Sequence, residues 1–410
     1  MPIPLRQVSL LLRKWQSAKD GRRVLRLFGE WREIQRQLPE PRPFDRKLLI
    51  IRLDDIGDYL LFRNQLRVYK RSPRWKDHVI TLLGNSSWKA IFSEFDASAV
   101  DDTVWVDKKE YLASASYRLN LWELLRRRGF GTVIAPSRTR PMLLDDLCML
   151  AAAPLRNLGS ANTHVHSRWN RISDSLYQQR FKPSDTAIHE FDFNGQFSAW
   201  ATGRRYEGRR PEFESWIEPP HMDSYVLCFV GANTRSRRWP VKRWIEFIQL
   251  YRRHYSSRVI LAGHAPVEVE MARTIGERTG AESIVGTASI LGILRWVAGA
   301  QAVLTNDTMA AHLSASVNRP TVIIANGVNY TRFTEYTNAG IGNVVTVYPD
   351  VFNRIRKHTG VVSYNYADAV SADIASIKAS TVFDKLQTVL PLEEAPLNPA
   401  ADPSNRAAEN

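Results

Sequence analysis

Residues 302–327 read AVLTNDTMAAHLSASVNRPTVIIANG, and this stretch decides the expected fold. An apolar run breaks at Asn306-Asp307-Thr308, continues through small residues and returns as a second apolar run. The pattern predicts a buried strand, a short helix and a second buried strand. Because a helix N-terminus at the carboxyl edge of a sheet offers backbone N–H groups and a positive dipole end, the corner predicts a phosphate site.

The rest of the chain repeats this alternation in two series. Strands are predicted at 47–53, 79–83, 103–106 and 132–135, and then at 225–232, 258–263, 283–285 and 302–306. Helical patterns lie between them, at 119–128, 241–254, 267–278 and 290–298. The sequence therefore predicts an α/β fold of two Rossmann-like, doubly wound parallel-sheet domains facing a central cleft. We expect an N-terminal domain with its linker at 45–220 and a C-terminal domain at 221–391, and 157–220 gives few regular signals.

The two ends of the chain differ from these domains. Residues 1–44 carry apolar residues at helical spacing with ten basic and four acidic residues, which predicts a basic amphipathic helical extension. Such an extension either packs its apolar stripe on the main body or docks on anionic lipid. Residues 392–410, rich in Pro, Ala, Asn and acids, predict a disordered tail.

The composition limits the class of protein and of partner. The chain has 410 residues, with 56 Lys and Arg against 42 Asp and Glu, a net charge of +14. This excess favours a polyanionic partner: nucleic acid, an anionic membrane surface or a phosphorylated substrate. The two cysteines lie far apart, so neither a disulfide framework nor a thiolate metal site is indicated. The absence of a long apolar run and of a secretory signal predicts a cytoplasmic protein.

The corner after residue 306 is the first candidate site. The backbone N–H groups of Thr308 and Met309 and the Thr308 hydroxyl would hold a diphosphate, and Asp307 would face the group attached to it. The alternative is structural, because Asp and Thr are common helix caps and His312 would then be a packed core residue.

Two further candidate sites follow first strands, one in each series. Arg237 and Arg238 lie at the same predicted sheet edge as Asp307, where two cations would neutralise a leaving diphosphate, or they form a solvated basic turn. Asp58 begins the helix after Gly57, where it is either a first-turn acid or a base that takes a proton from an attacking hydroxyl. Three acids in this loop, Asp54, Asp55 and Asp58, are weak evidence for a metal.

Several enzyme classes lack their usual marks in this chain. The sequence contains no GxxxxGK[ST], no GxGxxG after a strand, no HExxH and no GxSxG. A P-loop kinase, a nicotinamide dehydrogenase, a metalloprotease and a serine hydrolase are therefore not indicated. Nucleic-acid binding would need basic and aromatic residues interleaved over one surface, whereas the Trp and Arg residues at 235–244 are few and local.

Four segments together resemble glycosyltransferase family 9, the heptosyltransferase-like enzymes of bacterial lipopolysaccharide assembly. They are LLIIRLDDIGDYLL at 48–61, GANTRSRRWPVKRW at 231–244, LAGHAPVEVEMA at 261–272, and the segment from 284 to 327 that ends in the opening stretch. The resemblance runs from about residue 47 to about residue 348. It implies a GT-B fold with an acceptor-binding N-terminal half and a nucleotide-sugar-binding C-terminal half. It also implies inverting transfer without a metal or other cofactor.

The resemblance assigns roles to individual residues. Asp58 matches the catalytic base, with Asp55 and Gly57 in the acceptor-side loop. On the donor side the resemblance implies contacts to the diphosphate and the ribose of the donor, and contacts from the corner after residue 306. Met309 stands where the family usually has glycine. The donor-side residues are Gly231, Arg237, Arg238, Glu268, Asn306, Asp307, Thr308, Met309 and His312.

The resemblance also implies the partners. We expect a nucleotide-diphospho-sugar, with heptose as the candidate sugar, and a glycan or lipid-linked glycan acceptor such as lipopolysaccharide, which the net charge suggests is phosphorylated. Residues 1–44 would meet an anionic membrane at the cytoplasmic face of the inner membrane, and no nucleic acid is expected. One alternative is a catalytically inactive GT-B scaffold, suggested by Met309. The less favoured alternative is a basic nucleic-acid-binding protein.

Overall fold

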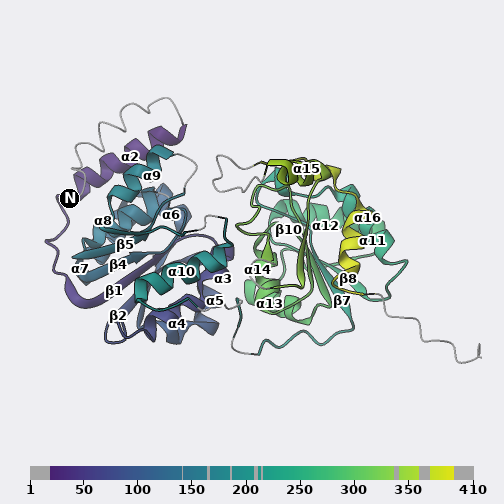
Figure 1. Cartoon of the computed structure of the whole chain (residues 1–410), viewed down its shortest axis with the longest axis horizontal. Helices are drawn as coiled ribbons and strands as arrows, with labels where there is room; N and C mark the ends of the chain where they lie inside the picture. Colours follow the sequence, from purple (N-terminus) through teal and green to yellow (C-terminus); the bar gives the residue numbers. More distant parts are fainter. Residues whose placement is uncertain are drawn as a thin grey trace, which may run out of the picture.

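The computed structural model describes residues 19–140, 142–163, 167–184, 187–206, 211–213, 216–336, 341–359 and 370–391. Two parallel sheets, each of six strands in this part of the chain, form the framework. Figure 1 shows them side by side, with α3 (Ile56–Phe62) and α10 (Glu190–Thr202) of the first half facing α13 (Ile290–Gly299) and α14 (Met309–Ser316) of the second. The predicted α/β architecture is confirmed.

The first sheet has the strand order β3-β2-β1-β4-β5-β6. Its central strand pairs in parallel on both sides, with Leu48 beside Ile80 and Leu49 beside Val133. The apolar run of that strand is fully buried, as expected for a strand covered on both faces. The strands are β1 (Phe44–Arg52), β2 (Val79–Asn85), β3 (Asp102–Val106), β4 (Phe130–Ala135), β5 (Arg156–Ser160) and β6 (Gln179–Phe181).

The second sheet repeats this topology in the order β12-β11-β10-β7-β8-β9. Counted from its own first strand, the order is the same as in the first sheet, so both halves have the doubly wound arrangement of dinucleotide-binding folds. In such sheets ligands bind beyond the carboxyl ends of the two strands where the order reverses, here β7 and β10. The strands are β7 (Tyr225–Phe229), β8 (Arg258–Ala262), β9 (Glu282–Ser283), β10 (Ala302–Asn306), β11 (Thr321–Ile324) and β12 (Val344–Val347).

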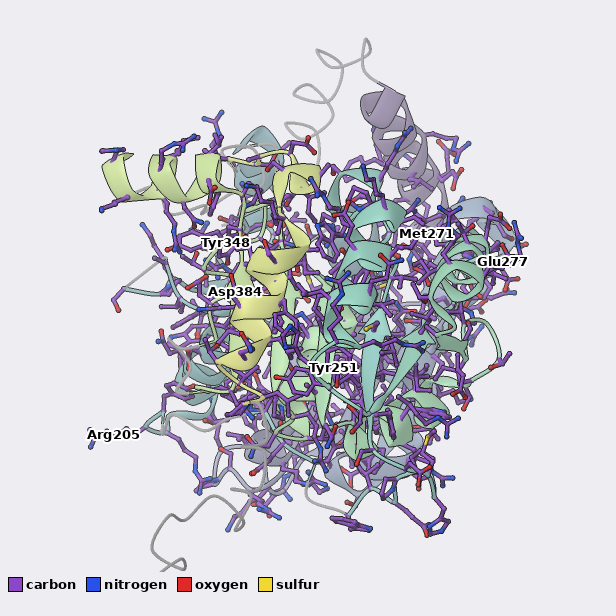
Figure 2. All side chains as sticks on the ribbon, turned by 90° about the vertical axis from the view of Figure 1, so that its right-hand side faces the viewer. Arg205, Tyr251, Met271, Glu277, Tyr348 and Asp384 are labelled. Carbon is purple, nitrogen blue, oxygen red and sulfur yellow. The ribbon has the colours of Figure 1, made fainter. Side chains whose placement is uncertain are left out.

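Helices cover both sheets. In the first half the others are α2 (Lys19–Ile34), α4 (Asn64–Lys70), α5 (Lys89–Phe95), α6 (Lys108–Ala113), α7 (Ala115–Arg128), α8 (Leu147–Ala152) and α9 (Ser167–Ser175). In the second half they are α11 (Val241–Tyr251), α12 (Pro266–Thr279), α15 (Asp350–Thr359) and α16 (Ala379–Gln387). Helix α16 packs on α11, and Figure 2 looks onto this side, with Asp384 on α16 and Tyr251 on α11.

The structure adds elements that the sequence did not indicate. Strands β5 and β6 and helices α9 and α10 occupy the region 157–220, which gave few regular signals. Strand β6 is a three-residue edge strand, and α10 is buried on nearly every side, so it shows no apolar stripe at helical spacing. Its Gly195 lies against the ring of Tyr206. The predicted domain boundaries stay predictions.

Helix α2 packs on the first half. Its apolar side, with Leu27, Phe28 and Trp31, is buried, and the Trp31 ring meets the Trp122 ring edge-on at 5.1 Å between centroids. Arg118 Nε donates to Glu30 Oε2 at 3.1 Å. This part of the predicted extension therefore uses its apolar stripe against the protein itself. Residues 1–18 and the predicted tail at 392–410 lie outside the described residues.

Candidate active site

Helices α3 and α14 meet where the two halves come together. At Gly57 a β-carbon would lie 2.8 Å from His312 Cδ2 and 3.6 Å from Met309 Cα. The first distance is shorter than a normal contact, so glycine allows the close approach of the two helices. Two of the predicted sites, the Asp58 turn and the 307–309 corner, are thus neighbours in space.

Asp58 lies in the first turn of α3, next to this contact. The fully buried Arg52 at the end of β1 holds the turn in place: its Nη2 donates to the Asp58 backbone oxygen at 3.1 Å and its Nε lies 2.9 Å from Asp54 Oδ1. Its third partner is Asn194 Oδ1 on α10, at 3.2 Å. Among the described residues, the Asp58 carboxylate itself takes part in no hydrogen bond or ion pair.

The acids of this turn have perturbed acidities. Burial raises the pKa of Asp58, and the positive charge of Arg52 opposes the shift. Burial raises the pKa of Asp54 well above its usual value, again against Arg52. A carboxylate with a raised pKa and no hydrogen bond from the described protein groups is a stronger proton acceptor than an ordinary aspartate, as a general base requires. Asp55 is exposed and forms an ion pair with Lys108 at 2.6 Å.

Asn306 forms the base of the opposite corner. Its side-chain nitrogen donates to the backbone oxygens of Val230 at 3.0 Å and Gly231 at 2.9 Å, and its Oδ1 accepts from the Trp239 N–H at 2.9 Å. The side chain is completely buried. Asn306 therefore joins the end of β10 to the loop after β7 and has a structural role, rather than presenting a free amide to a ligand.

The next two residues form the cap of α14. The Thr308 hydroxyl accepts from the Ala310 N–H at 3.3 Å and lies 3.0 Å from the Thr305 hydroxyl. Asp307 Oδ2 accepts from Asn329 Nδ2 at 2.6 Å, and burial raises the pKa of Asp307. Within the described part of the chain, the N–H groups of Thr308 and Met309 donate to no other group. They are the donors that the sequence predicted for a diphosphate.

The two arginines after β7 differ. Arg237 reaches the corner, because its Nη1 donates to the Asp307 backbone oxygen at 3.0 Å and lies 3.9 Å from Asp307 Oδ2. Arg238 points back on its own loop and donates from Nε to the Ala232 oxygen at 2.7 Å. The structure thus brings Arg237, and not both side chains, to the 307–309 corner.

Glu268 lies beside Gly231 in the first turn of α12. Its Oε2 accepts from the N–H groups of His264 at 2.6 Å and Ala265 at 3.0 Å, which caps the helix. A β-carbon at Gly231 would collide with the Glu268 carboxylate. Glu268 is therefore near the loop after β7, with one carboxylate oxygen already used by the protein backbone.

His312 is a buried, neutral side chain. Burial lowers the pKa of His312 to about 3. Its Nδ1 is hydrogen-bonded to the Tyr336 hydroxyl, and its ring lies against Gly57. At neutral pH it carries no charge that could bind phosphate, so its structural place is in the contact between the halves.

Met309 packs its side chain against the apolar core that includes residues of both sheets. The methionine side chain therefore lies in protein packing, and its backbone N–H still belongs to the first turn of α14. Met309 thus fills part of the interface between the halves and leaves an N–H donor at the corner.

Residues that the sequence did not single out lie near the Asp58 turn. Glu190 at the start of α10 is buried with Arg332, which comes from the second half; their Oε2 and Nε atoms are 2.9 Å apart. Asp145, in the π-helical turn Met142–Asp146, is 1% exposed, and burial raises its pKa to about 7. A lone acid or arginine in an unassigned region carries no spacing signal, which is why the sequence did not indicate them.

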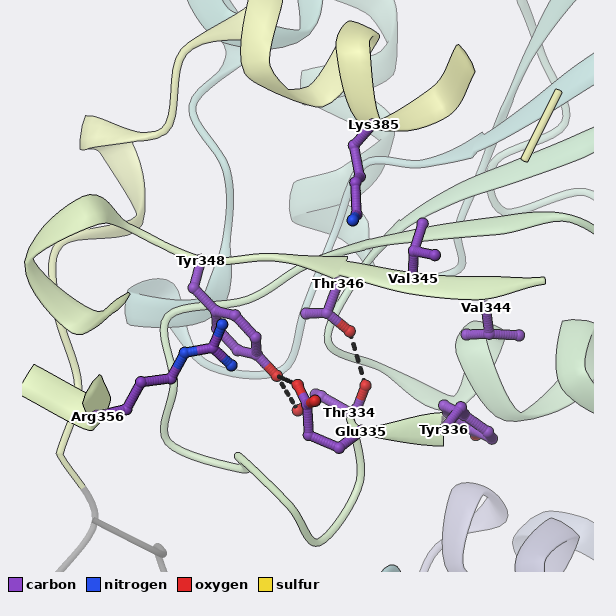
Figure 3. A pocket seen from close by; sticks show the side chains of 9 residues that line it. All are labelled: Thr334, Glu335, Tyr336, Val344, Val345, Thr346, Tyr348, Arg356 and Lys385. Carbon is purple, nitrogen blue, oxygen red and sulfur yellow. Dashed lines mark hydrogen bonds between the residues drawn. The ribbon is translucent and has the colours of Figure 1, made fainter. Parts of the chain in front are cut away.

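A hollow lies on the far side of the 329–336 loop, between β12, α15 and α16. Figure 3 shows Arg356 and Lys385 pointing into it, and the Tyr348 hydroxyl donating to Glu335 Oε1 at 2.6 Å. Tyr336, which is bonded to His312, also lines it. The hollow was not predicted, and Thr334, Glu335 and Tyr336 of the loop line it.

In the part of the chain that the structure describes, no three His, Cys, Asp or Glu side chains are grouped so that they could hold a metal ion. No helix found there is long and apolar enough to cross a membrane. Cys148 and Cys228 are both buried and free.

Comparison with known proteins gives two kinds of match. Residues 183–345 match the family model of glycosyltransferase family 9 (heptosyltransferase). Lipopolysaccharide heptosyltransferase 1 of Escherichia coli K12 is 33% identical over 107 residues, which are 26% of this chain and 33% of that protein. The same enzyme of Salmonella typhimurium LT2 is 31% identical over 103 residues, 25% of this chain and 32% of that protein. The matched segment thus spans about a third of the length of these relatives.

Solved structures share the fold over most of the chain. E. coli heptosyltransferase WaaC with ADP superposes with a TM-score of 0.61 at 17% identity, covering 84% of this chain and 99% of that one. A family 9 glycosyl transferase from Veillonella parvula gives a TM-score of 0.62 at 14% identity, covering 86% and 99%. The two-sheet framework is therefore a GT-B fold, and residues 183–345 within it match the model of glycosyltransferase family 9.

Proposed function

We propose that the protein is an inverting glycosyltransferase that needs no metal and moves a sugar from a nucleotide-diphospho-sugar to a glycan or lipid-linked glycan. The observation that carries the proposal is the contact of α3 with α14, which puts the Asp58 turn beside the 307–309 corner. A proton acceptor and an anion-binding helix start are the two groups that such a transfer needs.

In the proposed reaction Asp58 takes the proton of an acceptor hydroxyl. The hydroxyl oxygen attacks the anomeric carbon on the face opposite the leaving group, so a new C–O bond forms as the bond to the diphosphate breaks. The nucleoside diphosphate leaves with the electron pair of that bond. Because the attack comes from the opposite face, the anomeric configuration is inverted.

The leaving diphosphate is stabilised by Arg237 and by the N–H groups of Thr308 and Met309 in this proposal. Arg237 already lies at the corner, 3.0 Å from the Asp307 oxygen, and would turn toward the added charge. The dipole of α14 favours negative charge at the same place. Positive groups of the protein thus take the part that a metal ion has in other transferases.

The solved neighbours and the curated relatives support a proposal for the donor. Two of the solved structures were determined with ADP and with ADP-2-deoxy-2-fluoro heptose. The curated relatives are lipopolysaccharide heptosyltransferases. We propose ADP-heptose as the first candidate donor and a phosphorylated lipopolysaccharide precursor as the first candidate acceptor, met at the cytoplasmic face of the inner membrane with the help of the basic residues at 1–44.

The donor can be identified by thermal shift. The full-length protein is mixed in turn with ADP-, GDP-, UDP- and dTDP-sugars, and a ligand at about 100 times its dissociation constant should stabilise the fold by about 2.7 kcal/mol. The expected result is a rise in melting temperature with ADP-heptose that exceeds the rise with the other three. Equal or absent shifts with all four would contradict a nucleotide-sugar donor.

A further inference from the structure

The loop at residues 329–336 reaches from the second half onto the start of α10 in the first. Arg332 Nε donates to Glu190 Oε2 at 2.9 Å, and the Glu190 backbone N–H donates to the Arg332 backbone oxygen at 2.8 Å. Residues 190 and 332 are therefore joined through both side chain and backbone. This contact connects the two halves through residues 142 positions apart in the chain.

Other contacts support the same docking. Arg332 Nη1 donates to Thr139 Oγ1 at 2.9 Å, in the loop that follows β4. Phe333 packs with Leu61 of α3 and Phe191 of α10 in a small apolar cluster. Glu190 is 1% exposed and Arg332 is 8% exposed. Because both charges are removed from water, removing one of them leaves the other buried with less compensating charge.

The pair lies close enough to Asp58 to act on its charge. Leu61, which contacts Phe333, is on the same short helix as Asp58. Glu190 raises the pKa of Asp58 and Arg332 lowers it, as secondary effects beside burial and Arg52. Burial alone would raise the pKa of Glu190, but Arg332 and Arg138 outweigh it and keep that pKa below its usual value.

We propose that Arg332 and Glu190 are a positioning pair for Asp58. Docking of the 329–336 loop on α10 neutralises Glu190 and holds α3 against α14. The acceptor side of the site is therefore complete only while the two halves are together. The inference rests on the proposed function for its catalytic meaning. The effect of the Arg332 charge in the second half on the titration of Asp58 in the first half can be measured without turnover.

The other groups that face Asp58 are known from the packing around α3. Arg52 comes from β1, and Asp54 and Asp55 come from the turn before the helix. From α14 comes His312, which is neutral because burial lowers its pKa to about 3. Among the described residues that act on the pKa of Asp58, Arg332 is the cation from the second half.

The test is the titration of Asp58 in four backgrounds: parent, Arg332→Gln, Glu190→Gln and the double variant. In each, the melting temperature is compared with that of the same protein carrying Asp58→Asn, between about pH 4 and pH 9. Because folding raises the pKa of Asp58, each protein should lose stability relative to its Asn derivative as the pH rises toward the folded pKa, and the loss should level off above it.

The two single variants should move this titration in opposite directions. Arg332→Gln removes a positive charge and should shift it to higher pH, whereas Glu190→Gln removes a negative charge and should shift it to lower pH. The double variant should return toward the parent. Ordinary structural damage would not give shifts of opposite sign. Shifts in the same direction, or none, would overturn the proposal.

Two controls complete the design. Arg258 and Glu282 form an exposed pair of the same chemistry within the second half, with Nε and Oε1 2.8 Å apart, and their Gln variants should leave the titration of Asp58 unmoved. If Arg332→Gln does not fold, Arg332→Lys keeps the charge and should titrate as the parent does; a shift in that variant would also contradict the proposal.

Turnover separates this proposal from the proposed function. If no nucleotide sugar is consumed but the titrations shift in opposite directions, the charge relation stands and the transferase assignment fails. If sugar is transferred and the titrations do not move, the transferase assignment stands and the positioning pair is refuted.

Discussion

Gly57 of α3 and His312 of α14 lie so close that a β-carbon on the glycine would come within 2.8 Å of His312 Cδ2. The two residues belong to different halves of the protein, so this contact fixes the distance between the Asp58 turn and the 307–309 corner. The donor and acceptor ends of the proposed reaction are therefore set by packing between the halves.

Gly57→Val should separate the two helices and lower activity. The added side chain would meet the His312 ring and the backbone at Met309. We expect kcat/KM to fall by at least about tenfold, since a displacement of about 1 Å at reacting groups can cost on the order of a hundredfold. The matched control is Gly29→Ala in α2, where nothing lies within 4 Å of the new β-carbon. Full activity in Gly57→Val would show that this close approach is not required.

Met309→Ala should weaken the fold more than it weakens donor binding. The side chain packs in the core shared by the two sheets, whereas the backbone N–H remains at the start of α14. Calorimetry should find the dissociation constant of the nucleoside diphosphate changed by less than about threefold, below 1 kcal/mol. Thermal unfolding should show a loss of about 1–2 kcal/mol, since the side chain is only partly buried. A large gain in affinity would instead mean that the methionine obstructs the donor.

Arg237→Ala should weaken donor binding. Its guanidinium lies at the corner beside Asp307, and a hydrogen bond to a charged group contributes about 1.5–3 kcal/mol. Calorimetry should find the dissociation constant of the nucleoside diphosphate raised by about tenfold to a hundredfold. Arg235→Ala, an exposed arginine in the same turn, is the control and should bind as the parent does. If both variants bind the nucleoside diphosphate with equal affinity, Arg237 does not contribute specifically to diphosphate binding.

The pH profile of kcat/KM should have an acid limb that belongs to Asp58. Burial raises the pKa of Asp58, so the active carboxylate form is lost as the pH falls through a value above the usual aspartate pKa of about 3.9. His312 adds no limb at neutral pH, because its pKa is lowered to about 3. Initial rates over a series of buffers measure the profile. A rate that stays constant down to about pH 4 would exclude a base with a raised pKa.

Much of the fold could be predicted from the sequence, because its central strands are buried on both faces and read as apolar runs. Strands β1 and β10 are the clearest examples, and the polar turns that follow them were expected at the sheet edges. Helix α10 could not be predicted, since it is buried nearly all round and has no polar side. For the same reason Glu190, at its start, was not expected.

The candidate site was only partly predictable. The turn at Asp58 and the corner at Asp307 follow strand ends, and strand ends are visible in a sequence. The pairing of Glu190 with Arg332 joins residues 142 positions apart in different halves, which no local pattern encodes. The same is true of Asn306, whose side-chain nitrogen donates to Val230 and Gly231, 76 and 75 positions away in the chain.

The central claim is that Asp58 is the base that accepts the acceptor's proton. The most direct measurement is the turnover of Asp58→Asn with its donor and acceptor, together with the affinity for the nucleoside diphosphate. We predict that kcat falls by about a hundredfold to ten-thousandfold, the usual contribution of a general base, while the affinity stays within about twofold. Unchanged turnover in Asp58→Asn would contradict the account.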